Sequence, residues 1–163
     1  MKDELQDTIE KAMEHYMRLV KPKNAGWKVL EIGSRDLPPR GNYQYFGVGN
    51  DYKVLDSDES LSPDFVADIT DTKMPDGEWD LIIFSQGIAR VFDFEKAIRE
   101  CHRMLKPGGF LIVTCPFVAP YNGDDDYWRI SHSALGILLD EVGFSNGRSA
   151  SFNGILTSAL VRK

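Results

Sequence analysis

The sequence predicts an α/β fold in which helices cover both faces of an open, mostly parallel sheet of about seven strands. Two observations support this prediction. Short apolar runs, which suit buried strands, alternate along the chain with segments whose apolar residues recur at helical spacing. Near the end of the chain, Asn153-Gly154 separates two strand-like segments, as in a two-residue hairpin turn. We therefore expect the sheet to end in an antiparallel hairpin.

Size and charge set the first limits on function. A chain of 163 residues is the size of one domain, so we expect residues 1–163 to form a single unit. The formal net charge of -6 disfavours a broad surface for nucleic acids or anionic membranes. The first residues lack the apolar core of a signal peptide, and no apolar run is long enough to span a membrane, which predicts a cytoplasmic protein. The sequence leaves the oligomeric state open.

The first half of the chain begins with an amphipathic helix at 3–20, whose apolar side chains recur at helical spacing. An apolar run at 27–32, bounded by glycines, predicts a buried parallel strand. Further strands are expected at 43–48 and 64–68. The segment 49–63 between them is polar and acidic, which is typical of a long loop.

The second half continues the alternation of strands and helices. A turn at Asp76-Gly77 precedes a strongly apolar strand at 79–84. A helix is expected at 93–105, followed by Lys106-Pro107-Gly108-Gly109, which ends it, and by a strand at 110–115.

The hairpin is preceded by one more helix. Ser131 is a favourable N-cap for a helix that extends to about Glu141, and Gly143 ends it. The hairpin strands are expected at 144–152 and 155–161. Together with the earlier strands they give the seven expected in the sheet.

The turn after the first strand suggests a ligand site, because Gly33 lets the backbone approach a ligand closely. The dinucleotide pattern G-x-G-x-x-G is absent, and Pro38-Pro39 argues against a helix that could hold a pyrophosphate, so a nicotinamide-dependent oxidoreductase is disfavoured. A cofactor without phosphates fits better. S-adenosylmethionine is such a cofactor, and its cationic groups require carboxylates such as Glu31. The alternative is that Gly33 is only a turn glycine and Glu31 only a strand-end acid.

Metal and disulfide chemistry are not indicated. Cys101 and Cys115 are not in a C-x-x-C arrangement, and no cluster has the spacing of a zinc site. We interpret the acidic run at 124–126 as a solvated loop rather than a cation site. We therefore expect no metal, and two reduced thiols in the core.

Five segments together resemble the class I S-adenosylmethionine-dependent methyltransferases: VLEIGSRD at 29–36, YFGVGN at 45–50, VADITD at 66–71, EWDLIIFSQG at 78–87 and HRMLKPGGFLIVTCPF at 102–117. The likeness is strongest to small proteins of this type with EIGSR in the first motif and DYWR after the fifth strand. It implies a Rossmann-like sheet whose last strand is inserted antiparallel. It also implies S-adenosylmethionine as the cofactor, and a hydroxyl or amine of a small molecule, for example a sugar or lipid-linked sugar, as the methyl acceptor.

The resemblance further implies where the cofactor binds. Glu31, Gly33 and Ser34 would surround the methionine end, Asp68 and Ile69 would lie near the adenine, and Ser85 and Gln86 would lie beside the sulfonium. These residues follow expected strands, and ligands of open α/β sheets bind outside the carboxyl ends of the strands.

Two departures from the family pattern favour a second hypothesis. The acid that ends the second strand and holds the ribose hydroxyls falls on Gly49, so that Asn50 or Asp51 must replace it. The Glu-His that often follows the fourth strand is replaced by Ala89-Arg90. The alternative function is therefore a methyltransferase-fold protein that has lost activity and serves as a binding or assembly module.

The segment 116–130 mixes aromatic and polar residues and is expected to form one wall of the substrate pocket, at the sheet edge where Gly33 lies. The candidate catalytic residues here are Asp126, Arg129 and His132. Methyl transfer depends mainly on positioning of the acceptor, so a modest base suffices. Arg129 would either bind an anionic substrate or anchor the loop to an acid.

Overall fold

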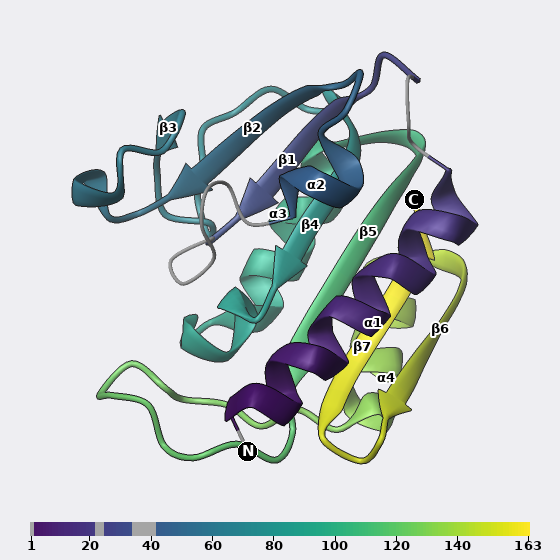
Figure 1. The fold of residues 1–163 in the computed structure, drawn as a ribbon. Coiled ribbons are helices and arrows are strands. Elements are labelled where there is room, and N and C mark those ends of the chain that lie inside the picture. The colour runs from purple at the N-terminus through teal and green to yellow at the C-terminus, as the bar shows by residue number, and fades with distance from the viewer. Residues whose placement is uncertain (1, 22–24, 34–41) are drawn as a thin grey trace.

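The computed structural model describes residues 2–21, 25–33 and 42–163, which form one mixed sheet with helices on both of its faces (Figure 1). The strands are β1 (Lys28–Ile32), β2 (Asp51–Asp56), β3 (Phe65–Val66), β4 (Trp79–Ser85), β5 (Leu105–Pro116), β6 (Ser145–Phe152) and β7 (Leu156–Arg162). The helices are α1 (Lys2–Val20), α2 (Tyr43–Phe46), α3 (Phe94–Met104) and α4 (His132–Val142), with short 3-10 helices η1 (Glu59–Leu61) and η2 (Gly87–Arg90).

The seven strands within the described ranges lie in the order β3-β2-β1-β4-β5-β7-β6. Neighbouring strands from β3 to β5 run parallel, whereas β7 pairs antiparallel with both β5 and β6. The predicted α/β class, the mostly parallel sheet and the terminal antiparallel hairpin are confirmed. Because the chain passes from β1 to β2 on one side and later to β4 on the other, the strand order reverses between β1 and β4.

Each face of the sheet is covered by its own helices, because successive side chains of a strand point to opposite faces. Val29 of β1 belongs to a buried cluster with Met13 of α1. Leu30, the next residue, belongs to a second cluster with Ile98 of α3 and Leu135 of α4. Figure 1 shows the same division, with α1 on one side of the sheet and α3 and α4 on the other.

The helix boundaries in the second half lie close to their predicted positions. The Ser131 hydroxyl accepts a hydrogen bond from the amide of Ala134 at 3.2 Å, as expected of the N-cap of α4. This helix ends at Gly143, which has a φ of 104° and so takes the left-handed conformation. Helix α3 ends at Met104, and β5 begins at Leu105, earlier than predicted.

The prediction of the second strand at 43–48 was wrong. Tyr43–Phe46 forms the short helix α2, and β2 lies in the segment that was interpreted as a loop. In β2 the apolar side chains of Tyr52, Val54 and Leu55 are buried, and two aspartates mark only the ends of the strand. Leu55 lies opposite Ile32 of β1 in the parallel register, so the carboxyl end of β2 is Asp56. Gly49 precedes this strand and does not end it.

The two cysteines are core residues, as predicted. Cys101 and Cys115 are both buried, and neither forms a disulfide. Burial raises the pKa of the Cys115 thiol to about 11, so this thiol stays protonated at neutral pH. Separately, no helix in the part of the chain that the structure describes is long and apolar enough to cross a membrane.

Candidate functional site

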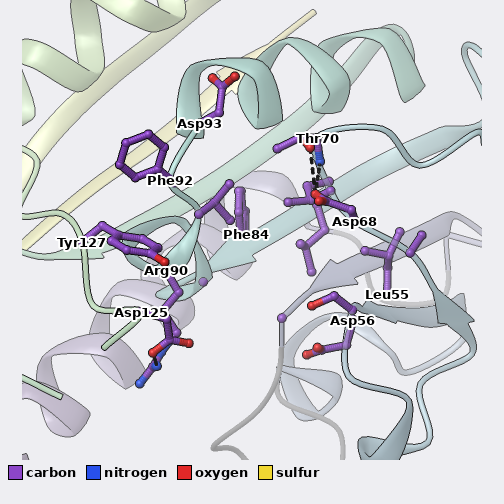
Figure 2. Close-up of a pocket in the computed structure, with 17 residues that line it drawn as sticks. Leu55, Asp56, Asp68, Thr70, Phe84, Arg90, Phe92, Asp93, Asp125 and Tyr127 are labelled. Carbon is purple, nitrogen blue, oxygen red and sulfur yellow. Dashed lines mark hydrogen bonds and ion pairs between the residues drawn. The ribbon is translucent and has the colours of Figure 1, made fainter. Parts of the chain in front are cut away.

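A pocket of about 430 Å³ opens at the carboxyl ends of the central strands (Figure 2). Its walls come from the ends of β1 and β2, from the segment 67–70 after β3, from residues between Gly87 and Asp93 after β4, and from the loop 117–131 between β5 and α4. This position coincides with the reversal of strand order between β1 and β4. Open α/β sheets bind their ligands at such a reversal.

Gly33 lies in this pocket, as predicted, directly after β1. Its φ is +66°, a backbone conformation that side chains rarely allow, and its amide donates to the carbonyl of Leu55 at 2.9 Å. The turn after β1 is therefore held against the end of β2. Ser34, the next predicted site residue, lies outside the described residues.

Glu31 does not line the pocket, although it precedes Gly33 by only two residues. Its side chain is buried on the sheet face covered by α1 and α2, where it accepts hydrogen bonds from Nδ2 of Asn42 at 2.8 Å and from the hydroxyl of Tyr52 at 2.5 Å. Burial raises the pKa of Glu31 to about 7, and these hydrogen bonds act in the opposite direction. Glu31 thus joins β1 to β2 and to the residue before α2.

Two aspartates line the pocket at the ends of neighbouring strands. Asp56 ends β2, and its carboxylate accepts a hydrogen bond from the amide of Asp58 at 2.9 Å. Asp68 follows β3, and its carboxylate accepts from the amide and hydroxyl of Thr70, both at 2.8 Å (Figure 2). Ile69 also lines the pocket. Sequence reasoning found Asp68 and Ile69 but missed Asp56, because it placed the second strand too early.

The structure corrects the predicted position of Asn50 and Asp51 in the cofactor site. They lie at the beginning of β2, at the amino ends of the parallel strands, whereas Gly33 lies at the carboxyl ends. The Asn50 side chain accepts from the amide of Trp27 at 3.0 Å and donates to the carbonyl of Phe46 at 2.8 Å. These hydrogen bonds hold the connection into β2, so neither residue is placed to bind a ligand in the pocket.

Ser85 and Gln86 lie at the end of β4, next to the pocket but outside its lining. Both side chains contact Thr114 of β5: the Ser85 hydroxyl lies 3.1 Å from the Thr114 hydroxyl, and Nε2 of Gln86 donates to it at 2.7 Å. Gln86 has a φ of 63°, which turns the chain from β4 into η2. In this structure the two residues therefore shape the turn beside the pocket.

The loop between β5 and α4 is fastened to the segment after β4. Arg90 forms an ion pair with Asp125, and the amides of Tyr127 and Trp128 both donate to the carbonyl of Ala89, at 3.0 and 3.1 Å. Asp125 and Tyr127 line the same pocket as Gly33, so the loop lies on the predicted side of the sheet. Ala89 and Arg90, which depart from the family pattern, are the residues that receive the loop.

The three candidate catalytic residues lie outside the pocket lining, which corrects their expected position. Arg129 makes a two-point ion pair with Asp126, with N···O distances of 2.6 and 2.7 Å. The pKa of Asp126 is lowered, mainly by the hydrogen bond from Arg129. Arg129 also donates to the carbonyls of Trp128 and Pro120, so it anchors the loop. His132 is the first residue of α4.

Charge in the pocket is predominantly negative. Among the described residues that line it, the carboxylates are Asp56, Asp68, Asp93 and Asp125, and the cation is Arg90. Arg90 is already paired with Asp125. The pocket therefore suits a ligand that carries positive charge.

The sequence was compared with protein families and with known proteins. Residues 31–113 match the family model described as a methyltransferase domain. A demethylmenaquinone methyltransferase from Mycolicibacterium gilvum is 39% identical over 61 residues, which cover 37% of this chain and 26% of that protein. The chain spans no more than about half the length of the curated relatives that it matches.

Solved structures share the fold at low sequence identity. A SAM-dependent methyltransferase from Aquifex aeolicus has a TM-score of 0.69 at 16% identity, and the match covers 92% of this chain and 88% of that chain. A 1,6-didemethyltoxoflavin-N1-methyltransferase from Burkholderia thailandensis, with bound S-adenosylhomocysteine, has a TM-score of 0.72 at 12% identity over 96% of this chain and 78% of that chain.

Proposed function

Because this chain belongs to the methyltransferase-domain family, we propose that it transfers a methyl group from S-adenosylmethionine to a hydroxyl or amine of a small molecule. The observation that carries the proposal is the acidic pocket at the reversal of strand order, with Asp56 and Asp68 at the ends of adjacent strands. Two kinds of acceptor are candidates. The family resemblance suggests a sugar or lipid-linked sugar, and the names of two relatives suggest a flat ring compound.

The residues of the pocket fit this cofactor. S-adenosylmethionine carries a sulfonium and an ammonium group against one carboxylate, so its net positive charge complements the aspartates. Asp56 would hold the ribose hydroxyls, Asp68 and Ile69 would lie near the adenine, and Gly33 would lie near the methionine end. When bound, the cofactor supplies an electrophilic methyl group.

The contribution of the protein would be mainly positional. An acceptor atom must approach the methyl group in line with the bond that breaks, and holding both partners in one pocket makes this approach frequent. The loop wall with Asp125 and Tyr127 would keep the acceptor against the cofactor and limit the access of water. No strong base is required of the residues that line the pocket.

The alternative, an inactive binding or assembly protein, loses much of its support. One argument for it was the missing ribose acid, and Asp56 occupies the strand end where that acid belongs. The other was Ala89-Arg90, and these two residues have a structural role in receiving the loop. Such a protein would bind the cofactor but would produce no S-adenosylhomocysteine with any acceptor.

Calorimetric titration tests the cofactor site, and formation of S-adenosylhomocysteine in the presence of a candidate sugar or flat ring acceptor distinguishes methyl transfer from the inactive alternative. S-adenosylmethionine and S-adenosylhomocysteine should bind, and NAD should not. Asp56→Asn should weaken binding roughly tenfold or more, because a hydrogen bond to a charged group contributes about 1.5–3 kcal/mol. Asp51→Asn is the matched control, since it removes a carboxylate from the other end of β2. Absence of binding at millimolar cofactor, or an equal loss in both variants, would contradict the proposal.

A further inference from the structure

Two aromatic side chains are exposed where the pocket opens. Phe92, which follows η2, is 72% exposed, and Tyr127, on the loop, is 48% exposed. Both line the pocket, and their rings lie edge to face with centroids 5.5 Å apart. Figure 2 shows them across the pocket from Asp56 and Asp68, the residues assigned above to the adenosine part of the cofactor.

Hydrogen bonds fix the backbone that carries each of these rings. The indole Nε1 of Trp128 donates to the carbonyls of Val91 and Phe92, at 3.0 and 3.1 Å. The Trp128 ring also packs edge to face on Phe94, with centroids 5.1 Å apart. Phe92 and Tyr127 are therefore held by hydrogen bonds on both backbones, since the Tyr127 amide is bound to Ala89. Two rings on a fixed backbone favour contact with a ligand ring, because less freedom is lost on binding than from a loose loop.

Charges beside the rings limit the ligand further. Asp93, next to Phe92 in the chain, and Asp125, two residues before Tyr127, also line the pocket. The Asp93 carboxylate accepts from the amide of Lys96 at 3.1 Å, and the Asp125 carboxylate is paired with Arg90. Arg90 balances the charge of Asp125, so the remaining charge of Asp93 disfavours an anion. The engagement of both carboxylates by protein groups leaves fewer partners for the many hydroxyls of a sugar.

The geometry points to Phe92 and Tyr127 as the acceptor subsite, which takes a planar ring without negative charge that carries the accepting hydroxyl or amine. This inference rests on the proposed function and narrows its substrate class. Offset or edge-to-face contacts between aromatic rings add about three- to tenfold in affinity beyond the area that they bury. A flat aromatic acceptor therefore gains more from this subsite than a saturated ring of the same size.

Ligand-observed NMR titrations in the presence of saturating S-adenosylhomocysteine test the subsite with matched compounds. The compounds are 2-naphthol, its saturated analogue decahydro-2-naphthol, the anion 2-naphthoate, and methyl glucoside. We expect 2-naphthol to bind at least threefold more tightly than each of the others. Phe92→Leu should reduce the preference for 2-naphthol over decahydro-2-naphthol and leave the discrimination against 2-naphthoate, which depends on charge, unchanged. Tyr121→Leu is the matched control. Tyr121 is an aromatic residue on the loop that carries Tyr127, and it is 71% exposed but outside the pocket lining.

The outcomes separate this inference from the proposed function. If S-adenosylhomocysteine binds but methyl glucoside or decahydro-2-naphthol binds as well as 2-naphthol, the acceptor subsite is wrong and the cofactor site stands. An equal effect of Phe92→Leu and Tyr121→Leu on the affinity for 2-naphthol would also overturn the acceptor subsite. If S-adenosylhomocysteine itself fails to bind, the proposed function fails.

Discussion

Glu31 is a carboxyl group that the fold removes almost entirely from water. Its side chain accepts hydrogen bonds from Asn42 and Tyr52, and burial raises its pKa from 4.5 to about 7. Between these two values the folded protein holds a proton that the unfolded chain has released. The free energy of unfolding therefore decreases as the pH rises through this window.

We predict that Glu31→Gln abolishes this pH dependence. The rise in pKa from 4.5 to about 7 corresponds to roughly 3 kcal/mol, so the variant should be more stable than the native protein at pH 8 when the two are matched at pH 4.5. Urea denaturation at a series of pH values measures the effect. Glu10→Gln, on the exposed side of α1, is the control. An unchanged slope in Glu31→Gln would show that Glu31 is ionised in the fold.

Part of the pocket could be predicted from single residues, and part could not. Gly33, Asp68 and Ile69 line it as expected, because a glycine or acid directly after an apolar strand is a clear local signal. Phe92 carries no such signal. It lies in the segment after β4, and its place in the pocket depends on Trp128, far along the chain, which holds its carbonyl. Tertiary contacts of this kind are absent from local sequence patterns.

At the scale of elements, prediction succeeded where one period dominated. Helices α1, α3 and α4 have apolar positions that repeat at helical spacing, and β4 has an unbroken apolar run at 81–84. The prediction of β2 failed because aspartates at both ends and a lysine interrupt its apolar residues. The aromatic residues of α2, by contrast, are typical of a strand when they are considered alone. Pairing with β1 decides between the two segments, and pairing is a long-range property.

The loop between β5 and α4 leads to a prediction about Arg129. The two-point ion pair with Asp126, whose side chain is 6% exposed, predicts that Arg129→Ala lowers the free energy of unfolding by about 1–3 kcal/mol. Arg129→Lys should retain only part of this stability, because lysine cannot pair at two points. Urea denaturation measures the loss, and calorimetry with S-adenosylhomocysteine measures any effect on the pocket. A lower rate of methyl transfer with an unchanged free energy of unfolding would instead indicate that Arg129 contacts the substrate.

At the scale of the whole molecule, the Rossmann-like sheet places the pocket across several elements. Strands β1, β2 and β4, the segment after β3 and the loop after β5 all contribute to its walls. A ligand that bridges these elements binds the folded state and has no comparable site in the unfolded chain. Ligand binding and global stability are therefore coupled.

This coupling predicts a thermal shift. S-adenosylhomocysteine at one hundred times its Kd should stabilise the protein by about 2.7 kcal/mol, which corresponds to a rise in Tm of roughly 5–10 °C for a domain of this size. Differential scanning calorimetry gives the shift directly. In Asp56→Asn the shift at the same concentration should be smaller, while the Tm without ligand stays close to native. An equal shift with NAD would argue against a selective site.

The order of the strands also leaves the sheet with two very different edges. At one edge β3 has only two residues, so it offers few free backbone groups to another strand. At the other edge β6 has eight residues, including the small side chains of Ser149, Ala150 and Ser151. Unpaired edges recruit strands from other molecules and promote aggregation. β-Branched and aromatic side chains favour strand pairing more than the small side chains found here. Solubility is therefore most sensitive to β-branched or aromatic substitutions in β6, far from the pocket.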